Sequence, residues 1–333
     1  MAVTRILKMT VIALAALPGL AVAGLAMPGL AIAEPKAVAT VGMLADVAAR
    51  VAGDCVAVET MMGPGTDPHL YKASAGDVRL LFSADAILYA GNNLEGQLGE
   101  VLGKLAERRP IKAVAEAAVP ADRLLAFAGA HYPDPHVWMD VSQWALTAPV
   151  IVEVLGGLAP DCAGAMQARA TAYAAELAAL HEWVRASVAT IPEQQRILVT
   201  AHDAFAYYGR AYGIDVAGIQ GISTESEAGI ADIRQTVDMV VARNVPAVFI
   251  ESTINPRTIQ AVINAAEGRG HAVALGPQLY SDAMGEAGTA AGTYIGMIHA
   301  NTQAIVTALG GTPAALPSEL VAWAERWNLA TGG

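Results

Sequence analysis

The chain has 333 residues, of which 54% are hydrophobic and 15% are charged, and its formal net charge is -11. This composition excludes a disordered protein, and the acidic balance disfavours nucleic acid or an anionic membrane surface as the main partner while it permits a cation as ligand. The length suggests about two domains, each with a core of its own.

The first 33 residues have the pattern of a secretory signal. Arg5 and Lys8 precede an apolar stretch without acidic residues, which ends in Ala31-Ile32-Ala33. Glycine and proline recur in this stretch, which favours a cleaved signal over a membrane anchor, the alternative that its length allows. We therefore expect a signal peptide over residues 1–33 and a periplasmic protein. No cysteine lies in this segment, so a lipid-modified N-terminus is not supported.

Short β-rich segments alternate with helical ones from residue 37 onward. The pattern predicts strands at 38–41, 56–61, 86–89 and 111–114, and helices at 44–51, 75–82 and 94–105. Strands that alternate with helices form parallel sheets with helical crossovers, so we expect an N-terminal α/β lobe over residues 34–159.

The segment 160–192 predicts a helix that links two lobes. It is rich in Ala, Glu, Leu and Arg and has no proline between Pro160 and Pro192. A helix of about 30 residues extends roughly 45 Å, which is long enough to run along two lobes. Such a stiff connector would limit hinge motion.

A second α/β series predicts a C-terminal lobe over residues 193–333. Its strands are expected at 197–200, 216–217, 247–251 and 272–275, and its helices at 204–211, 230–243, 257–268 and 293–309. The predicted fold class is therefore α/β, with two lobes that each contain a mainly parallel sheet flanked by helices and that are joined by a long rigid backbone helix.

The two cysteines, Cys55 and Cys162, are too few for a disulfide-stapled scaffold. They could pair in an oxidising compartment or remain buried small apolar residues. Because they fall in different predicted elements far apart in sequence, the sequence favours the unpaired state.

Candidate chemistry lies in four loops. The tripeptide Asp-Pro-His occurs twice and ends in His69 and in His136. The proline fixes φ ahead of each histidine, so the imidazole is presented from a stiff loop. His202 and Asp282 follow predicted strands, and the carboxyl ends of parallel strands are where α/β sheets bind ligands. The histidines are far apart in sequence, so the hypothesis of one site rests on the combination of loops and not on spacing.

Six segments occur in a fixed order along the chain: 66–69, 133–140, 201–205, 220–229, 249–252 and 280–285. Together they resemble the zinc- and manganese-binding solute receptors of ABC importers, the TroA-like group. The resemblance extends from about residue 37 to residue 309. It implies a bilobed receptor with a rigid backbone helix, which agrees with the connector predicted from composition.

The resemblance also implies four metal ligands, carried over by motif: His69 and His136 from the N-terminal lobe, and His202 and Asp282 from the C-terminal lobe. Imidazoles suit zinc, and a carboxylate tolerates manganese. Zn²⁺ or Mn²⁺ would be cargo that a monomeric receptor passes to an ABC permease. Four protein ligands leave no evident open position for an activated water, so we expect no enzymatic activity.

The sequence leaves the physiological metal open. Dedicated zinc members of the resembled group carry a long loop rich in histidine and acids before the second histidine, whereas the run from Asp122 to His136 is short and contains only His131. Dedicated manganese members usually carry Glu at the position of His202, so the imidazole at that position shifts the balance back towards zinc.

Three carboxylates are candidates for a supporting role. Glu251 could orient a ligand imidazole or be an ordinary capping or surface carboxylate. Asp67 and Asp134 could tune the site or simply bond loop amides. The acidic segment 221–229 could face the other lobe or a transporter, although a solvated loop is the simpler account.

Two other functions compete with the receptor hypothesis. A zinc-dependent hydrolase would need an open coordination position and a general base, and nothing obvious in the sequence supplies one. A receptor for a chelate such as a siderophore would share the architecture, but it would need arginine or aromatic contacts, and the four loops contain no arginine.

Overall fold

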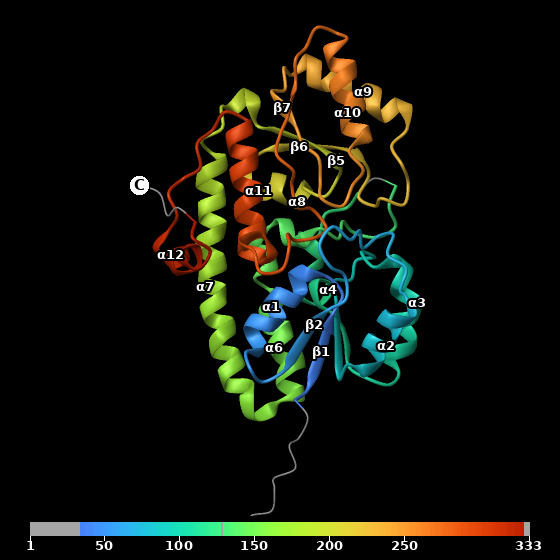
Figure 1. Ribbon diagram of the computed structural model, residues 1–333, viewed down its shortest axis with the longest axis vertical. Coiled ribbons are helices and arrows are strands. Elements are labelled where there is room, and N and C mark those ends of the chain that lie inside the picture. The colour runs from blue at the N-terminus through green and yellow to red at the C-terminus, as the bar shows by residue number, and fades with distance from the viewer. Residues whose placement is uncertain (1–33, 128, 330–333) are drawn as a thin grey trace, which may run out of the picture. The chain divides into compact units, whose positions relative to one another are not determined.

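The computed structural model describes residues 34–127 and 129–329 (Figure 1). The predicted signal peptide, residues 1–33, lies outside the described residues. From Glu34 onward the chain forms one compact unit, so the lobe boundaries at 159 and 193 stay a prediction.

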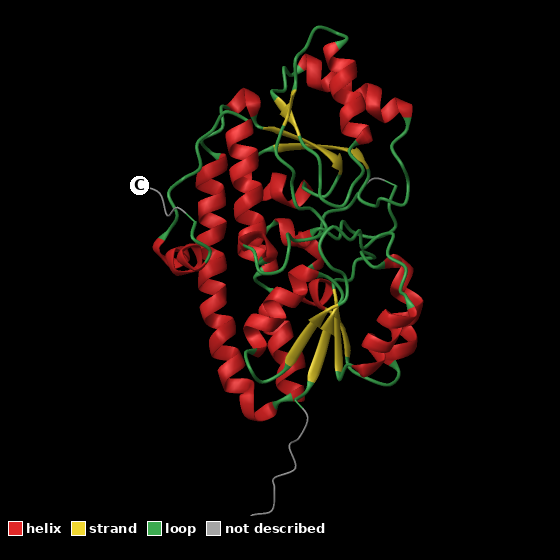
Figure 2. Cartoon of the chain, viewed as in Figure 1, coloured by secondary structure: helices red, strands yellow, loops and turns green. Residues whose placement is uncertain are grey.

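The N-terminal sheet has four parallel strands in the order β2-β1-β3-β4. Their bounds are β1 Lys36–Ala39, β2 Ala57–Thr60, β3 Ala86–Tyr89 and β4 Ile111–Ala113. The central strands β1 and β3 are almost entirely buried and apolar, as parallel strands are when helices cover both faces of the sheet. Figure 2 shows helices on both sides of this sheet.

Six helices belong to this part of the chain: α1 Gly42–Ala52, α2 Ala75–Ser83, α3 Gly99–Ala106, α4 Val114–Ala118, α5 Val141–Trp144 and α6 Thr147–Leu158. The start of α2 shows how local sequence sets a boundary. The Ser74 hydroxyl accepts the N–H of Gly76 and Asp77, while the Asp77 carboxylate accepts the N–H of Ser74. This capping box satisfies donors that the first turn of a helix leaves free.

Helices α5 and α6 were not predicted from the sequence. The segment Val141–Leu158 has a mean hydropathy of 1.4, and by length and composition alone it could cross a membrane. In the structure Ile151 and Leu155 are buried, and α6 packs against α1 and α7. Pro149 lies in the first turn of α6, where a helix tolerates proline, and the β-branched residues of this segment weaken the helical signal.

The predicted connector is confirmed as α7, Ala163–Val188, a helix of 26 residues that follows a 3₁₀ turn at Pro160–Cys162. It packs against α1 and α6 and also against α8, α11 and α12. In Figure 1 it runs beside both lobes, with α11 alongside it.

The C-terminal strands are β5 Ile197–His202, β6 Asp215–Gln220, β7 Ala247–Val248 and β8 Ala274–Leu275. β5 pairs with β6 and β7 pairs with β8, all in parallel. The N–H of Phe249 donates to Val199 O at 2.9 Å and joins the two pairs. The order β6-β5-β7-β8 therefore repeats that of the N-terminal sheet. The helices are α8 Ala206–Tyr212, α9 Ile230–Ala242, α10 Arg257–Glu267, α11 Tyr294–Ala308 and α12 Ser318–Arg326.

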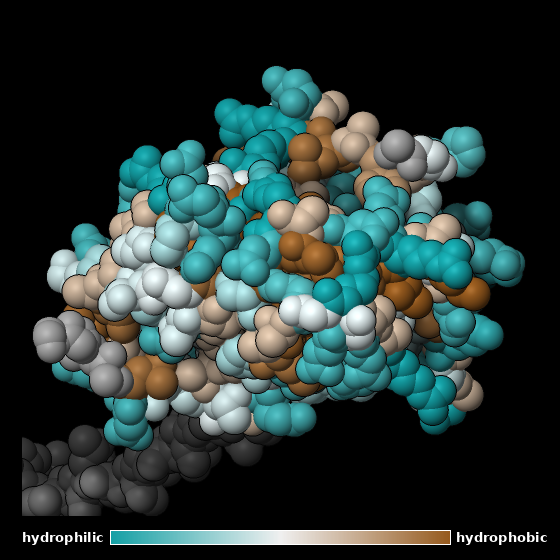
Figure 3. Space-filling view, turned by 90° about the horizontal axis from the view of Figure 1, so that it is seen from above, coloured by the Kyte–Doolittle hydropathy of each residue, from teal (hydrophilic) through white to brown (hydrophobic). Residues whose placement is uncertain are grey.

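The larger of two apolar clusters among the described residues extends through both lobes, and the smaller one lies in the C-terminal lobe. The larger cluster contains strands and helices of the N-terminal lobe together with residues of α7, α8 and α11. The rings of Trp138, Trp144 and Tyr294 are fully buried in it: the ring centroids of Trp138 and Trp144 are 6.2 Å apart, and those of Trp144 and Tyr294 are 5.9 Å apart. Separation of the lobes would expose these rings to water, so the core opposes wide opening. On the outer face shown in Figure 3, apolar residues are interspersed with hydrophilic ones.

The expectation that Cys55 and Cys162 stay unpaired is wrong, because they form a disulfide. Cys55 follows α1 and Cys162 precedes α7, and these helices pack against each other, so their ends meet. The Arg169 guanidinium holds the same junction by donating to the carbonyl oxygens of Val51 and Ala52. The disulfide fastens the beginning of α7 to the N-terminal lobe.

Candidate metal centre

His69 lies on the loop that follows β2. The carboxylate of Asp67 accepts the N–H of His69 through Oδ1 at 2.9 Å, so the loop closes tightly around Pro68. The imidazole is almost fully buried, with 3% of the residue exposed. Of its two ring nitrogens, Nε2 faces the other candidate ligands.

His136 follows β4 and the short bridge between Ala126 and Pro133. The Oδ1 atom of Asp134 accepts the N–H of His136 at 2.9 Å and lies 2.7 Å from Nδ1 of its ring. Asp134 therefore fixes both the backbone and the ring, and Nε2 is left to face the cluster. Trp138 packs edge-on against this imidazole, with ring centroids 5.2 Å apart, as part of the core.

His202 is the last residue of β5, and Glu251 comes shortly after the neighbouring strand β7. Glu251 Oε1 accepts the N–H of His202 at 2.9 Å, and Oε2 lies 2.5 Å from Nδ1. Both residues are buried. Glu251 thus lies where a carboxylate orients the imidazole and directs Nε2 of His202 towards Asp282.

Asp282 lies on the loop between β8 and α11. Asn301 on α11 holds this loop, because its amide accepts the N–H of Tyr280 at 2.8 Å and donates to Tyr280 O at 2.7 Å. The indole of Trp138 donates to Ser281 O at 2.9 Å and links the loop to the neighbourhood of His136. The Asp282 carboxylate is buried.

The structure brings His69, His136, His202 and Asp282 together, with one donor atom of each within 4.8 Å of the others. Asp282 Oδ1 is 3.2 Å from His136 Nε2, and Oδ2 is 3.2 Å from His202 Nε2 and 3.8 Å from His69 Nε2. The Nε2 atoms of His69 and His136 are 3.4 Å apart. Four ligands at about 2.0–2.1 Å from a tetrahedral zinc ion would be about 3.3–3.4 Å apart, so the cluster has the dimensions of such a site.

Charges in the cluster perturb one another strongly. Burial would raise the pKa of Asp282, but the imidazoles of His202 and His136 hold it well below its usual range. Burial would lower the pKa of the two histidines. Asp134 and Asp282 nevertheless raise the pKa of His136 to about 9, and Glu251 and Asp282 raise the pKa of His202 well above its usual value. Without a metal ion both imidazoles therefore carry protons at neutral pH.

His69 differs from the other two histidines. Burial and, to a smaller extent, the neighbouring imidazoles of His136 and His202 lower the pKa of His69 to about 3. Asp282 acts in the opposite direction, but its effect is smaller than that of burial. His69 is therefore neutral at neutral pH and ready to donate an electron pair.

Several buried polar atoms of the cluster lack a hydrogen-bond partner among the described residues, including Nε2 of His202 and both oxygens of Asp282. Buried polar atoms are nearly always satisfied, so unsatisfied atoms that converge on one point indicate a place for an ion. Imidazole nitrogens with a carboxylate oxygen are donors that suit zinc and also accept manganese. The residues therefore fit a divalent transition metal.

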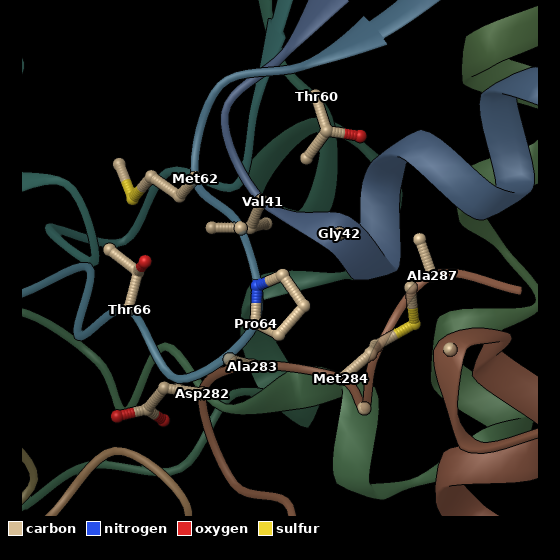
Figure 4. Close-up of a pocket in the computed structure, with 13 residues that line it drawn as sticks. Val41, Gly42, Thr60, Met62, Pro64, Thr66, Asp282, Ala283, Met284 and Ala287 are labelled. Carbon is tan, nitrogen blue, oxygen red and sulfur yellow. The ribbon is translucent and has the colours of Figure 1, made fainter. Parts of the chain in front are cut away.

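A cavity of about 290 Å³ borders the cluster at Asp282. Figure 4 shows Val41 and Gly42 from the beginning of α1, Pro64 from the His69 loop, and Met284 from the Asp282 loop around it. Most of its lining is apolar. Both the N-terminal and the C-terminal lobe contribute to its wall.

Thr224 is a residue near the site that the sequence did not predict. Of the two alternatives for segment 221–229, a solvated loop or a segment that faces the other lobe, the structure favours the second: Thr224 is buried and its hydroxyl donates to Asp67 Oδ2 at 2.6 Å. The signal available was the place of this segment among the six motifs. The carboxylates of the segment indicate exposure to solvent, whereas the residue that makes the contact is an uncharged threonine.

Comparison with known proteins agrees with this architecture. The chain is 45% identical over 271 residues to the manganese-binding lipoprotein MntA of Bacillus subtilis (strain 168), covering 81% of this chain and 88% of the relative. It is 44% identical over 276 residues to the zinc-binding protein TroA of Treponema pallidum (strain Nichols), covering 83% and 89%. The solved structure of the periplasmic zinc binding protein TroA from Treponema pallidum superposes with a TM-score of 0.81 at 44% identity, covering 83% of this chain and 99% of that one.

Fold and site together define the class of the protein, a metal-binding solute receptor of ABC importers. The family model described as "Zinc-uptake complex component A periplasmic" (ZnuA) matches residues 37–308. The chain belongs to this family. The resemblance seen in the six motifs is thereby confirmed, and neither the hydrolase nor the chelate receptor finds support in the comparisons.

Proposed function

We propose that this chain captures one divalent transition metal ion between its lobes and hands it to the permease of an ABC importer. His69, His136, His202 and Asp282 are the four ligands. The observation that carries the proposal is the convergence of these four side chains, from four separate loops, to within 4.8 Å of one another. A cation held by both lobes would couple them, because each lobe supplies two ligands.

The chain would act as a receptor and not as an enzyme. All four ligands are buried, and four protein ligands complete a tetrahedral shell. A hydrolytic site keeps one coordination position of the metal for water, and a tetrahedral shell of four protein ligands leaves no such position free. Catalytic use of the metal therefore finds no support in the donor set.

The cargo would be zinc or manganese. One relative at 45% identity is described as manganese-binding and another at 44% as zinc-binding, so similarity favours neither metal. For nitrogen and oxygen ligands the usual order of affinity places zinc above manganese. Zinc would therefore be retained by the purified protein even if manganese were the physiological cargo.

The receptor would work in the periplasm as a monomer, after cleavage of the signal peptide at residues 1–33. The description of the family model includes the word periplasmic, whereas the relative from Bacillus subtilis is a lipoprotein. Lipid attachment in that manner requires a cysteine, and the first cysteine of this chain is Cys55, which forms the disulfide.

The test is metal binding by variants of the mature chain. His69→Ala and Asp282→Ala should each greatly weaken binding of Zn²⁺ and Mn²⁺ in calorimetric titrations, whereas His131→Ala, which removes an exposed histidine outside the cluster, should not. Elemental analysis of protein purified without added metal, followed by competition between the two ions, identifies the preferred cargo. Unchanged affinity in both cluster variants would refute the site.

A further inference from the structure

The segment 221–229 connects β6 to α9 in the C-terminal lobe and contacts a loop of the N-terminal lobe. Its residue Thr224 is only 7% exposed. The Thr224 hydroxyl donates to Asp67 Oδ2 at 2.6 Å, and Asp67 belongs to the loop that presents His69. A hydroxyl of one lobe is thus bonded to a carboxylate of the other, two residues before a metal ligand.

Asp67 uses both of its carboxylate oxygens. Oδ2 accepts the Thr224 hydroxyl, and Oδ1 accepts the N–H of His69 at 2.9 Å. Pro68 lies between them and fixes φ at that residue. The backbone of His69 is therefore held in place relative to Asp67, and a change in the position of Asp67 would move the imidazole with it.

His69 has less support than the other two histidines. His136 and His202 each have a carboxylate beside Nδ1, at 2.7 Å and 2.5 Å. Among the described residues, no carboxylate lies within 4.0 Å of Nδ1 of His69, and the Asp282 carboxylate lies 3.8 Å from its Nε2. The orientation of the His69 ring thus depends on the loop that carries it.

The His136 segment is also bonded to the C-terminal lobe at several points. The Tyr207 hydroxyl donates to Asp134 O at 2.9 Å, and the Trp138 indole donates to Ser281 O at 2.9 Å. From the loop 62–72, within the described part of the chain, the contact between Asp67 and Thr224 is the hydrogen bond that crosses to the C-terminal lobe. Hydrogen bonds therefore join the segments that carry His136, His202 and Asp282, and the loop that carries His69 is bonded to the C-terminal lobe through Thr224.

A cavity of about 400 Å³ lies beside this contact, and its lining includes Asp67, Thr224 and the polar side chains Thr253 and Arg257. Water in such a polar cavity can solvate both partners when the hydrogen bond breaks. The contact can therefore open without leaving a buried charge unsatisfied.

We propose that Thr224 is a positioning residue for His69, whose hydroxyl holds the His69 loop against the C-terminal lobe and thereby sets the rate at which bound metal leaves. The inference rests on the proposed role of His69 as a ligand. Thr224 itself touches no metal. Its effect should appear in dissociation, because release requires His69 to move away from the other three ligands, whereas the first encounter with the ion does not require the contact.

The experiment compares Thr224→Val, which keeps the shape but removes the hydroxyl, with Thr224→Ser, which keeps the hydroxyl. Dissociation of Zn²⁺ into an excess of a fluorescent chelator is followed by stopped flow. Loss of a hydrogen bond to a charged acceptor should raise the dissociation rate by about tenfold to a hundredfold in the valine variant, and the serine variant should stay near wild type. Thermal unfolding of the metal-free variants checks that each of them is folded.

Thr236→Val is the matched control, because Thr236 is also buried and donates its hydroxyl within α9, to Asp232 O. A dissociation rate of Thr224→Val equal to that of the wild type and of this control overturns the inference, while a loss of binding in His69→Ala still supports the proposed function. Binding by His69→Ala that matches the wild type overturns both.

A second readout does not depend on metal. Hydrogen–deuterium exchange in a peptide covering 62–73 should increase in Thr224→Val, whereas exchange in β5 and α11 should not. Thr224→Ala replaces the valine variant if that variant does not fold. Unaltered exchange of 62–73 in a folded variant contradicts the role of Thr224.

Discussion

Metal binding by this receptor should release protons. The protonation states of the three histidines in the cluster predict the number of protons released per ion. His136 has a pKa raised to about 9, and the pKa of His202 is also raised well above its usual value, so both imidazoles are protonated at pH 7 in the metal-free protein. A protonated imidazole cannot coordinate a metal. His69, with a pKa lowered to about 3, has no proton to lose. We therefore expect about two protons to leave for each ion bound at pH 7.

The magnitude follows from the shift at His136. Removal of a proton at pH 7 from a group with a pKa of about 9 costs about 3 kcal/mol, or about a hundredfold in affinity. With His202 also protonated, affinity should increase by up to about a hundredfold for each pH unit between pH 6 and pH 8, because two protons compete with the metal. Affinity at low pH is therefore limited by protons on the ligands.

Calorimetric titration of Zn²⁺ in buffers of different ionisation enthalpy counts the protons released, and its pH dependence gives the slope. Release of fewer than about one proton at pH 7, or an affinity that does not change from pH 6 to pH 8, would refute this account of the cluster. Asp134→Asn is an informative comparison, because Asp134 is the charged group that contributes most to the raised pKa of His136, so the variant should release fewer protons.

Four further outcomes are expected. In the metal-free protein the raised pKa of His136 contributes stability that is fully present below about pH 6.5 and is lost as the pH rises through about 9, so the free energy of unfolding in urea should fall over that interval. Glu251→Gln and Asp134→Asn should each weaken Zn²⁺ binding by about tenfold to a hundredfold, measured by chelator competition, because the imidazoles lose the carboxylates that orient them; equal affinity would mean that these carboxylates only support the loops. Cys55→Ser with Cys162→Ser should lower the free energy of unfolding by about 2–4 kcal/mol and leave metal affinity unchanged, and a loss of affinity would contradict a purely structural disulfide. Removal of metal with a chelator should lower the thermal midpoint, since an ion present at a hundred times its dissociation constant stabilises the folded state by about 2.7 kcal/mol, and an unchanged midpoint would show that no ion had been bound.

Regular elements with a strong local signal could be predicted from the sequence. Strand β1 and strand β5 are short β-rich segments bounded by helical ones, and α7 is rich in good helix formers with prolines only at its borders. Helices α5 and α6 could not be predicted in this way, because Pro149 and several β-branched residues interrupt the helical pattern. Their helical state depends on packing against α1 and α7.

The candidate ligands could be selected from the sequence because each one lies in a motif of the family that the chain resembles. The pairing of Cys55 with Cys162 could not, since it depends on how the end of α1 meets the beginning of α7, which no local pattern encodes. The same reason applies to Thr224, whose partner belongs to the other lobe. Contacts between distant segments are fixed by tertiary packing, and a single sequence carries little trace of them.

The state of the disulfide between Cys55 and Cys162 also indicates which cellular compartment each molecule has reached. These are the two cysteines of the chain, so a molecule kept in the reducing cytoplasm would have two free thiols, and one that had reached an oxidising compartment would have none. Alkylation of intact cells followed by mass measurement would therefore separate exported molecules from retained ones, independently of whether the first 33 residues had been removed.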